Sequence, residues 1–148
     1  MAQITVTPYA FGHPEPNEPV TITTAGIIAM YQTVRDDDIF DDEYRGKLLT
    51  RILRSGLEIV TDEPVADVIG RWAADDSLKL AWLSRAPTDK PGDDPVVAVN
   101  ASRVTDVRAV PADRYAAAYR TLVFFGGVRV AVVEEPDEVR RRLDEATA

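Results

Sequence analysis

The feature that most constrains the fold of this chain is an internal repeat. The stretch GLEIVTDEPVADVIGRW at 56–72 has a later counterpart, GVRVAVVEEPDEVRRRL, at 127–143. Each contains a glycine, an alternating run of β-branched residues, an acidic pair, a proline and then helical spacing of valine and arginine. Because a pattern that recurs at a fixed spacing is the mark of repeated structural units, the sequence predicts one unit present twice.

Two shifts align the halves of the chain. A shift of 76 residues matches Pro19 with Pro95, Val20 with Val96, Ala25 with Ala101 and Val34 with Val110. A shift of 71 matches Thr50 with Thr121, Gly56 with Gly127, Val68 with Val139 and Arg71 with Arg142. The shift changes from 76 to 71 in the connection between Val34 and Thr50, which is longer than its counterpart in the second half. The alternative is that two similar β-β-α pieces occur within one unrelated fold.

Each half has the same order of local patterns. A strand with alternating apolar residues, at 3–9 or 77–85, precedes a loop rich in proline, glycine and acidic residues. A longer strand follows, with an expected break at Ala-Gly or Ala-Ser, and then a hairpin with a two-residue turn containing glycine. Pro64 and Pro136 are placed to start a closing helix, since proline suits the first helical position.

One segment carries two conflicting patterns. The residues Phe40, Tyr44, Leu48 and Ile52 recur every four positions, which is typical of one face of a helix. We expect a short helix or turn there, with the strand of the following hairpin starting near Leu49 in the first half. The corresponding strand of the second half is expected to start near Arg120.

These patterns predict an α+β fold of internally duplicated β-rich units, each a small antiparallel sheet with a closing helix. The expected units are 1–76, with an acidic insertion at 35–48, and 77–148. A unit of this size has a marginal core alone, so we expect the two units to pack as a pseudo-twofold pair. Trp72, Leu78 and Trp82 flank the joint, where bulky apolar residues favour packing over ligand binding.

The charge of the chain limits its partners. The formal net charge is −8, and all of it lies in the first half, because 77–148 has 11 basic and 11 acidic residues. Nucleic acid is an unlikely partner, since binding a phosphate backbone needs clustered Lys and Arg. The run Arg140, Arg141 and Arg142 points in different directions around a helix, and we expect a solvated surface there.

The expected location is the cytoplasm of a bacterium or the host cell of a phage. The chain contains no cysteine, which excludes disulfides and thiol chemistry. No run approaches the about 20 apolar residues that a membrane helix needs, so we expect no contact with a membrane. The start of the chain has no basic segment followed by an apolar stretch, so a secretory signal is not predicted.

An acidic cluster is the most conspicuous candidate site. Its members are Asp36, Asp37, Asp38, Asp41, Asp42 and Glu43. The spacing does not match a calcium-binding EF-hand loop, because Phe40 takes a ligand position and the glycine is missing. We consider three roles: a solvated connection, a cation site, and a docking surface for a basic protein partner. The last is the candidate functional role.

Catalytic motifs are not found. His13 is the one histidine and lies in a proline-rich loop without a serine elbow to accompany it. Gly126-Gly127 lacks the downstream pattern of a phosphate-binding loop. The polar residues Asn100, Ser102 and Arg103 are expected to satisfy turn amides. We therefore predict no enzymatic activity and no cofactor.

Three stretches of the second half carry a family resemblance. They are VNASRVTDV at 99–107, RTLVFFGG at 120–127 and VVEEPDEVRRRL at 132–143. Together they resemble the short flagellar and swarming-motility family called FlbD, in which a Val-Asn-Pro strand start precedes a hairpin and a Glu-Val helix. The chain departs from that pattern by lacking a proline after Asn100, by the repeat and by the acidic insertion. The resemblance implies a framework of strand, turn and helix, and no catalytic residues.

The sequence favours a non-enzymatic module for protein interaction or assembly, acting through its repeat surfaces on a protein partner or on a second copy. The alternative is a regulatory domain that binds a small ligand or a metal ion at a site between the two repeats.

Overall fold

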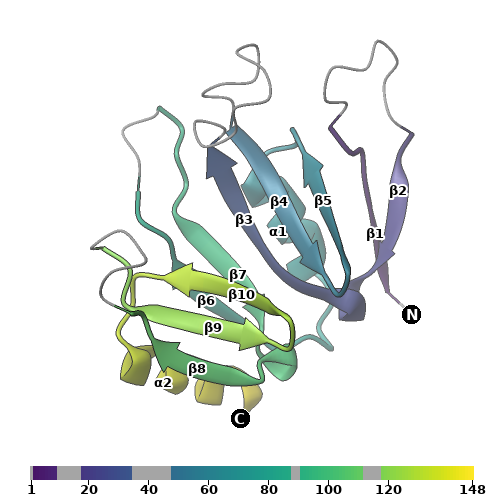
Figure 1. Ribbon diagram of the computed structural model, residues 1–148. Coiled ribbons are helices and arrows are strands. Elements are labelled where there is room, and N and C mark those ends of the chain that lie inside the picture. Colours follow the sequence, from purple (N-terminus) through teal and green to yellow (C-terminus); the bar gives the residue numbers. More distant parts are fainter. Residues whose placement is uncertain (1, 10–17, 35–47, 88–90, 112–117) are drawn as a thin grey trace.

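The computed structural model describes residues 2–9, 18–34, 48–87, 91–111 and 118–148 (Figure 1). The first half, 1–76, contributes β1 (Gln3–Val6), β2 (Val20–Thr23), the 3₁₀ turn η1 (Thr24–Gly26), β3 (Ile27–Val34), β4 (Leu48–Arg54), β5 (Leu57–Thr61) and α1 (Val65–Ala73). The second half, 77–148, contributes β6 (Leu80–Ser84), β7 (Val96–Asn100), the 3₁₀ turn η4 (Ala101–Arg103), β8 (Asp106–Ala109), β9 (Thr121–Phe125), β10 (Val128–Val132) and α2 (Pro136–Thr147). The predicted α+β class is correct.

The strands form three antiparallel sheets that do not divide at the middle of the chain. The sheets have the orders β1-β2, β5-β4-β3-β7-β6 and β10-β9-β8. The prediction of one small sheet per half is therefore wrong, because β6 and β7 extend the sheet begun by β3–β5. The reason lies in β7: Val97, Ala98 and Val99 are all fully buried, and an apolar strand buried on both faces belongs inside a sheet.

The joint between the halves is the antiparallel pair β3–β7, in which Met30 lies opposite Ala98. A twofold arrangement would need a reciprocal pair between β8 and β2. Among the described residues, β8 pairs only with β9 and β2 only with β1. The predicted pseudo-twofold packing is therefore wrong. The joint pairs β3 of the first half with β7 of the second, and the described residues form no reciprocal pair.

Two hydrophobic cores lie on opposite faces of the five-stranded sheet. Met30 and Ala98 face the core that α1 and the β1–β2 hairpin cover. Ala29, Val97 and Val99 face the core that α2 and the three-stranded sheet cover. Figure 1 shows α1 behind β4 and β5, and α2 below β8. Alternate residues of β3 and β7 thus serve different cores, as the pleat of a strand requires.

The closing helices begin where the prolines predict. Pro64 precedes the first residue of α1, and Pro136 is the first residue of α2. The buried residues of α1 are spaced three and four apart, which places them on one face: Val65, Val68, Ile69 and Trp72. Asp67 lies in the first turn of α1, and Asp137 and Glu138 lie in the first turn of α2. Carboxylates at these positions are stabilised by the positive end of the helix dipole.

The predicted hairpins and strand starts are confirmed. Two-residue turns join β4 to β5 and β9 to β10. In the β4–β5 turn the second residue, Gly56, has the left-handed conformation (φ 78°). In the β9–β10 turn it is the first residue, Gly126, that has this conformation (φ 73°). β4 starts at Leu48 and β9 at Thr121, so the four-residue spacing does not continue as a helix beyond 48. The predicted strand breaks correspond to η1 and η4.

The two tryptophans have opposite environments. Trp72 lies on the buried face of α1, and its indole Nε1 donates to the carbonyl oxygen of Thr24 at 3.1 Å. Trp82 is 46% exposed and is the one large hydrophobic side chain exposed among the described residues. The prediction that the bulky residues near the joint are packed is therefore correct for Trp72 and wrong for Trp82.

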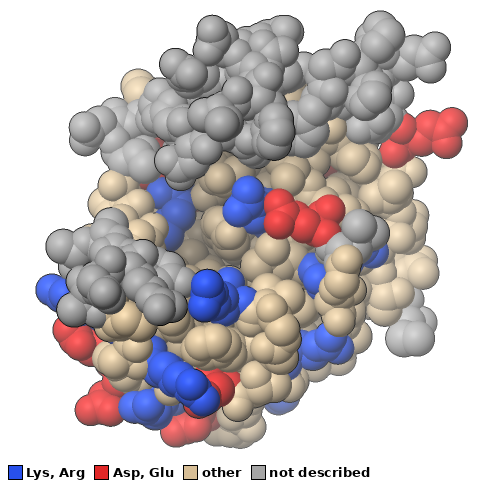
Figure 2. All heavy atoms as spheres, in the orientation of Figure 1, with Lys and Arg blue, Asp and Glu red and all other residues tan. Residues whose placement is uncertain are grey.

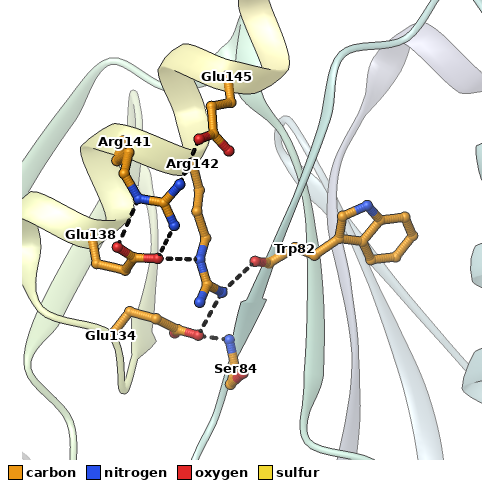
Figure 3. Close-up of polar contacts among 7 residues, drawn as sticks. All are labelled: Trp82, Ser84, Glu134, Glu138, Arg141, Arg142 and Glu145. Atoms are coloured by element: carbon orange, nitrogen blue, oxygen red, sulfur yellow. Dashed lines mark hydrogen bonds and ion pairs between the residues drawn. The ribbon is translucent and has the colours of Figure 1, made fainter.

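Each closing helix is held to an edge strand by a pair of ionic side chains, which we call the Glu–Arg clamp. In the second half it consists of Glu134 and Arg142 (Figure 3). Glu134 Oε1 accepts the N–H of Ser84 at 2.9 Å, and Arg142 Nη1 donates to the Trp82 carbonyl at 2.9 Å. The two side chains contact each other at 3.1 Å. The clamp thus occupies backbone groups of β6 that no strand pairs with.

The first half has the same clamp, made of Glu63 and Arg71. Glu63 Oε2 accepts the N–H of Thr7 at 3.1 Å, and Arg71 Nη1 donates to the Thr5 carbonyl at 2.9 Å. Arg71 Nη2 lies 2.5 Å from Glu63 Oε1. The hydrogen bond with Arg71 lowers the pKa of Glu63 below its ordinary value of 4.5, against a smaller opposing effect of burial. The carboxylate is thus stabilised in its charged form.

Truncation of the two tryptophans should separate their roles. We expect Trp72→Ala to lower the free energy of unfolding by about 3–5 kcal/mol, because it removes a buried ring and a hydrogen bond. Trp82→Ala should change it by about 0.5 kcal/mol or less, as exposed substitutions do. Urea unfolding followed by circular dichroism measures both. Equal losses in the two variants would contradict the assignment of Trp72 to the core.

The Glu63 clamp should make stability depend on pH. Because the folded-state pKa of Glu63 is lowered, its contribution is present above the unfolded-state pKa of about 4.5 and is lost as pH falls through the folded-state pKa. Glu63→Gln should therefore destabilise the protein at neutral pH, and the difference from the wild type should shrink in acid. Urea unfolding at several pH values tests this, with Glu18→Gln at an exposed site as the control. A difference that is constant with pH would contradict it.

Candidate functional site

A cleft opens between the five-stranded and the three-stranded sheets, and we call it the inter-sheet cleft. It has a volume of about 250 Å³ and is lined by Tyr31, Arg85, Val97, Tyr119, Arg129, Val130 and Ala131. Tyr31 belongs to the first half and the other residues to the second. Figure 2 shows a hollow on this face with Lys and Arg side chains around it. The cleft thus combines aromatic and cationic groups on a chain of negative net charge.

Arg85 lines the cleft and is fixed in place by several contacts. Its Nε donates to the Gln32 carbonyl at 2.8 Å, and its Nη2 donates to Gln32 Oε1 and to the Asp94 carbonyl, both at 3.0 Å. It forms an ion pair with Asp93 in which both side chains are nearly buried. Because a buried charge needs a partner of opposite sign, Arg85 and Asp93 anchor the loop before β7 to β3.

One wall of the cleft is formed by a cross-strand pair on β3 and β4. Tyr31 lies opposite Arg51, and the Arg51 guanidinium lies 5.9 Å from the centre of the Tyr31 ring. Arg51 Nη1 also donates to the Tyr31 hydroxyl at 3.3 Å, and Arg51 Nε lies 2.8 Å from Glu58 Oε1. These contacts orient the Tyr31 ring, so the wall is a preformed aromatic surface.

The opposite wall carries Arg129, a cation for which the described residues provide no carboxylate partner. Arg129 is exposed on β10 and, within the described part of the chain, forms no ion pair. Nearby, the Tyr119 hydroxyl accepts the N–H of Ala86 at 3.3 Å, which ties the segment before β9 to the end of β6. A guanidinium presents several donors in one plane, which suits a carboxylate or a phosphate. The cleft is therefore equipped to hold an anionic group beside two aromatic rings.

The described residues that line the cleft include no carboxylate, histidine, serine or cysteine. The lining groups that could take part in proton transfer are the hydroxyls of Tyr31 and Tyr119. For binding, the arrangement offers permanent positive charge, hydrogen-bond donors and flat apolar surface.

Two further hollows are less suited to an anion. One of about 400 Å³ lies between Trp82 and α2, but its arginines already have carboxylate partners. Arg141 contacts Glu138 and Glu145, and Arg141 followed by Arg142 lowers the pKa of Glu138 to about 2. The other, of about 270 Å³, is lined by Asp62, Glu63 and Asp94 among others and would repel an anion.

Several predicted site residues lie outside the described part of the chain. These are His13 and the whole candidate docking cluster: Asp36, Asp37, Asp38, Asp41, Asp42 and Glu43. Within the described ranges, no three His, Cys, Asp or Glu residues come together in a way that could hold a metal ion. In the same ranges, no helix is both long enough and apolar enough to cross a membrane.

Other predictions concern residues that the structure does describe. Asn100 Oδ1 accepts the N–H of Ser102 at 3.2 Å, which confirms its role in satisfying turn amides. The run Arg140, Arg141 and Arg142 is ion-paired rather than simply solvated, and Arg142 belongs to a clamp. Sequence reasoning missed the cleft residues. Tyr31 and Arg129 lie within strands that are far apart in the sequence, whereas Arg85 and Tyr119 lie just outside strands, so no local pattern marked them.

Comparison with family models, with curated proteins and with solved structures finds no significant match to the chain. The likeness to the FlbD family stays a prediction. The function is therefore argued from the residues of the structure.

Substitutions should distinguish Arg85, which supports the fold, from Arg129, which is exposed and available to a ligand. Arg85→Ala removes a nearly buried ion pair with Asp93 and the hydrogen bonds to Gln32 and Asp94, and we expect a loss of about 3–5 kcal/mol in the free energy of unfolding. Arg129→Ala removes an exposed side chain and should change stability by about 0.5 kcal/mol or less. Urea unfolding of both variants measures this. A large loss for Arg129→Ala would show that it supports the fold and is not available for a ligand.

Proposed function

We propose that this protein is a non-enzymatic binding module whose inter-sheet cleft recognises an acidic segment of a protein partner. The observation that carries the proposal is Arg129, an exposed cation without an ion pair in the described structure, at a cleft lined by Tyr31 and Tyr119. Tyr and Arg are among the residue types that contribute most to binding energy at protein interfaces.

The size of the cleft favours a side chain as its occupant. Pockets for small molecules are about 300–1,000 Å³. The cleft, at about 250 Å³, is smaller than that range and is open on one side to solvent. One or two carboxylate side chains of a partner fit such a volume, whereas a nucleotide cofactor does not.

Local charge decides the sign of the partner. The net charge of −8 would repel a distant anion, but screening limits such forces to about 8–10 Å in physiological salt. A carboxylate inside the cleft is close to Arg129 and to the paired Arg85. At contact distance the nearby cations dominate, so the cleft selects acidic segments although the whole protein is acidic. We place this function in the cytoplasm.

We also infer that the two halves are copies of one β-β-β-β-β-α unit. The support is the agreement in detail between the clamps. The side chain of Thr50 donates to the Glu63 carbonyl at 2.7 Å, and that of Thr121 donates to the Glu134 carbonyl at 2.6 Å. Each half orders its elements alike. On this view the cleft is a feature of the pair and not of either unit.

A small anionic ligand is the second candidate, and one observation favours it. Residues from both halves line the cleft, as a regulatory site between the units would require. Such a ligand would raise the melting temperature in a saturable way, because it binds the folded state alone. Inorganic phosphate and dicarboxylates are suitable probes, with Ca²⁺ and Mg²⁺ tested in parallel.

Binding of an acidic peptide tests the main proposal. Fluorescence anisotropy with labelled hexaglutamate should show saturable binding that weakens with salt. Arg129→Ala should reduce the affinity by about 10–100-fold, because a hydrogen bond to a charged group contributes about 1.5–3 kcal/mol. Arg141→Ala, which removes the same charge from α2, should leave the affinity nearly unchanged. Labelled hexalysine should not bind in the cleft.

Two results would contradict the proposal. One is the absence of any binding of hexaglutamate by a folded protein at low salt. The other is an equal loss of affinity in the Arg129→Ala and Arg141→Ala variants, which would indicate diffuse charge attraction. Saturable stabilisation by phosphate without peptide binding would favour the small-ligand candidate instead.

A further inference from the structure

The contact between β3 and β7 has no equivalent between β8 and β2, which are edge strands in the described structure. Inside the chain, β3 pairs with β7, with Ala29 opposite Val99, Met30 opposite Ala98 and Tyr31 opposite Val97. This contact joins unlike edges, so repeating it would extend an array of units rather than close a pair. The edges that would continue the array are those of β8 and β2.

The ladders identify β8 as the counterpart of β3. Met30 lies opposite Ile52 in the β3–β4 pair, and Val107 lies opposite Val123 in the β8–β9 pair. Ile52 and Val123 occupy the same place in their hairpins, because each lies two residues before the turn-flanking residue at which its strand ends. Val107 therefore corresponds to Met30.

The same reasoning identifies β2 as the counterpart of β7. Thr21 lies opposite Thr5 in the β1–β2 pair, and Ala98 lies opposite Trp82 in the β6–β7 pair. Both strands are followed directly by a 3₁₀ turn, η1 or η4. Thr21 therefore corresponds to Ala98, which is the residue opposite Met30 at the centre of the joint. This correspondence is a shift of 77 residues, one more than the 76 of the sequence alignment, and the starts of η1 at Thr24 and η4 at Ala101 have the same shift.

The β2 edge is open in the described structure. Its only strand neighbour there is β1, and Thr21 is exposed. The N–H of Thr24 donates to the Ala2 carbonyl, so the alternation of an antiparallel ladder directs the backbone groups of Ile22 toward β1 and those of Thr21 away from it. Thr21 thus presents a donor and an acceptor to an incoming strand.

The β8 edge is blocked by side chains. The N–H of Val107 donates to Asp106 Oδ1 at 2.8 Å, and the Val107 carbonyl accepts from Arg140 Nη2 at 3.1 Å. Arg108 Nε holds the other oxygen of Asp106 at 2.5 Å. We call Asp106 and Arg140 the edge cap. Charged side chains on an edge strand are a usual defence against pairing between molecules.

We propose that the β8 edge and the β2 edge of a second copy are complementary surfaces for head-to-tail assembly, and that the edge cap holds this interface closed. The register follows from the joint inside the chain. Val107 would lie opposite Thr21 of the second copy, with Asp106 opposite Ile22 and Arg108 opposite Val20. The inference rests on the correspondence between the halves and does not depend on a ligand in the cleft.

Removing the edge cap tests the proposal. The double variant Asp106→Ala/Arg140→Ala leaves the net charge unchanged, so any association cannot be attributed to charge. Sedimentation velocity over a wide range of concentration should show the wild type as a monomer of 16.3 kDa. The double variant should form a concentration-dependent series of oligomers that extends beyond the dimer, because each added copy leaves one edge free.

Blocking β2 in the uncapped variant supplies the decisive comparison. Thr21→Pro removes the outward N–H, and Thr21→Lys places a charge at the edge while keeping the backbone intact. Either change should return the uncapped variant to the monomer. The second substitution keeps the test valid if the proline disturbs the β1–β2 pair. Arg141→Ala/Glu145→Ala removes another ion pair from α2 without a net change in charge, and it should stay monomeric.

Three outcomes would overturn the proposal. A folded uncapped variant that stays monomeric at every concentration would show that the edges are not complementary. Oligomers that persist with Thr21→Lys would place the contact elsewhere. A wild type that assembles as readily as the uncapped variant would show that Asp106 and Arg140 do not hold the interface closed. Hexaglutamate binding by the monomeric variants reports on the cleft separately.

Discussion

The antiparallel pairing of β3 with β7 is the interaction on which the rest of the structure depends. It joins three strands of the first half to two of the second, and it creates one sheet with a core on each face. Each half alone would expose one side of that sheet. The pairing buries Met30 and Ala98 on one face and Val97 and Val99 on the other. A chain of this length reaches a sizeable core in this way although each unit is small.

Open sheets expose unpaired backbone groups at their edges, and this protein covers several of these groups with ionic side chains. Glu63 with Arg71 and Glu134 with Arg142 occupy the outward backbone groups of β1 and β6. Asp106 and Arg140 do the same for β8. A carboxylate accepts an edge N–H while a guanidinium donates to an edge carbonyl, so each set of side chains takes the place of a neighbouring strand. Arg140 and Arg142, which sequence reasoning assigns to a solvated surface, have this role.

The inter-sheet cleft is a consequence of the same joint. Because β10 approaches the face of β3 and β7, residues far apart in the sequence come to line one hollow, among them Tyr31 and Arg129. The buried Arg85 ties the loop before β7 to β3 and lines the cleft. The cleft therefore belongs to neither half of the chain alone.

The sequence by itself determined the local elements of this protein. Alternating residues, two-residue glycine turns and helix-starting prolines act over a few residues, and they placed the strands, the hairpins and both helices correctly, from the start of β4 near Leu49 to that of α2 at Pro136. The sequence could not assign Trp82 to the surface, nor bring Tyr31 and Arg129 together. Only the tertiary structure decided which edges pair and which side chains meet across the sheets. The physical reason is that backbone groups at a strand edge accept any suitable neighbour, so the choice of β7 as the partner of β3 depends on how both cores are buried together.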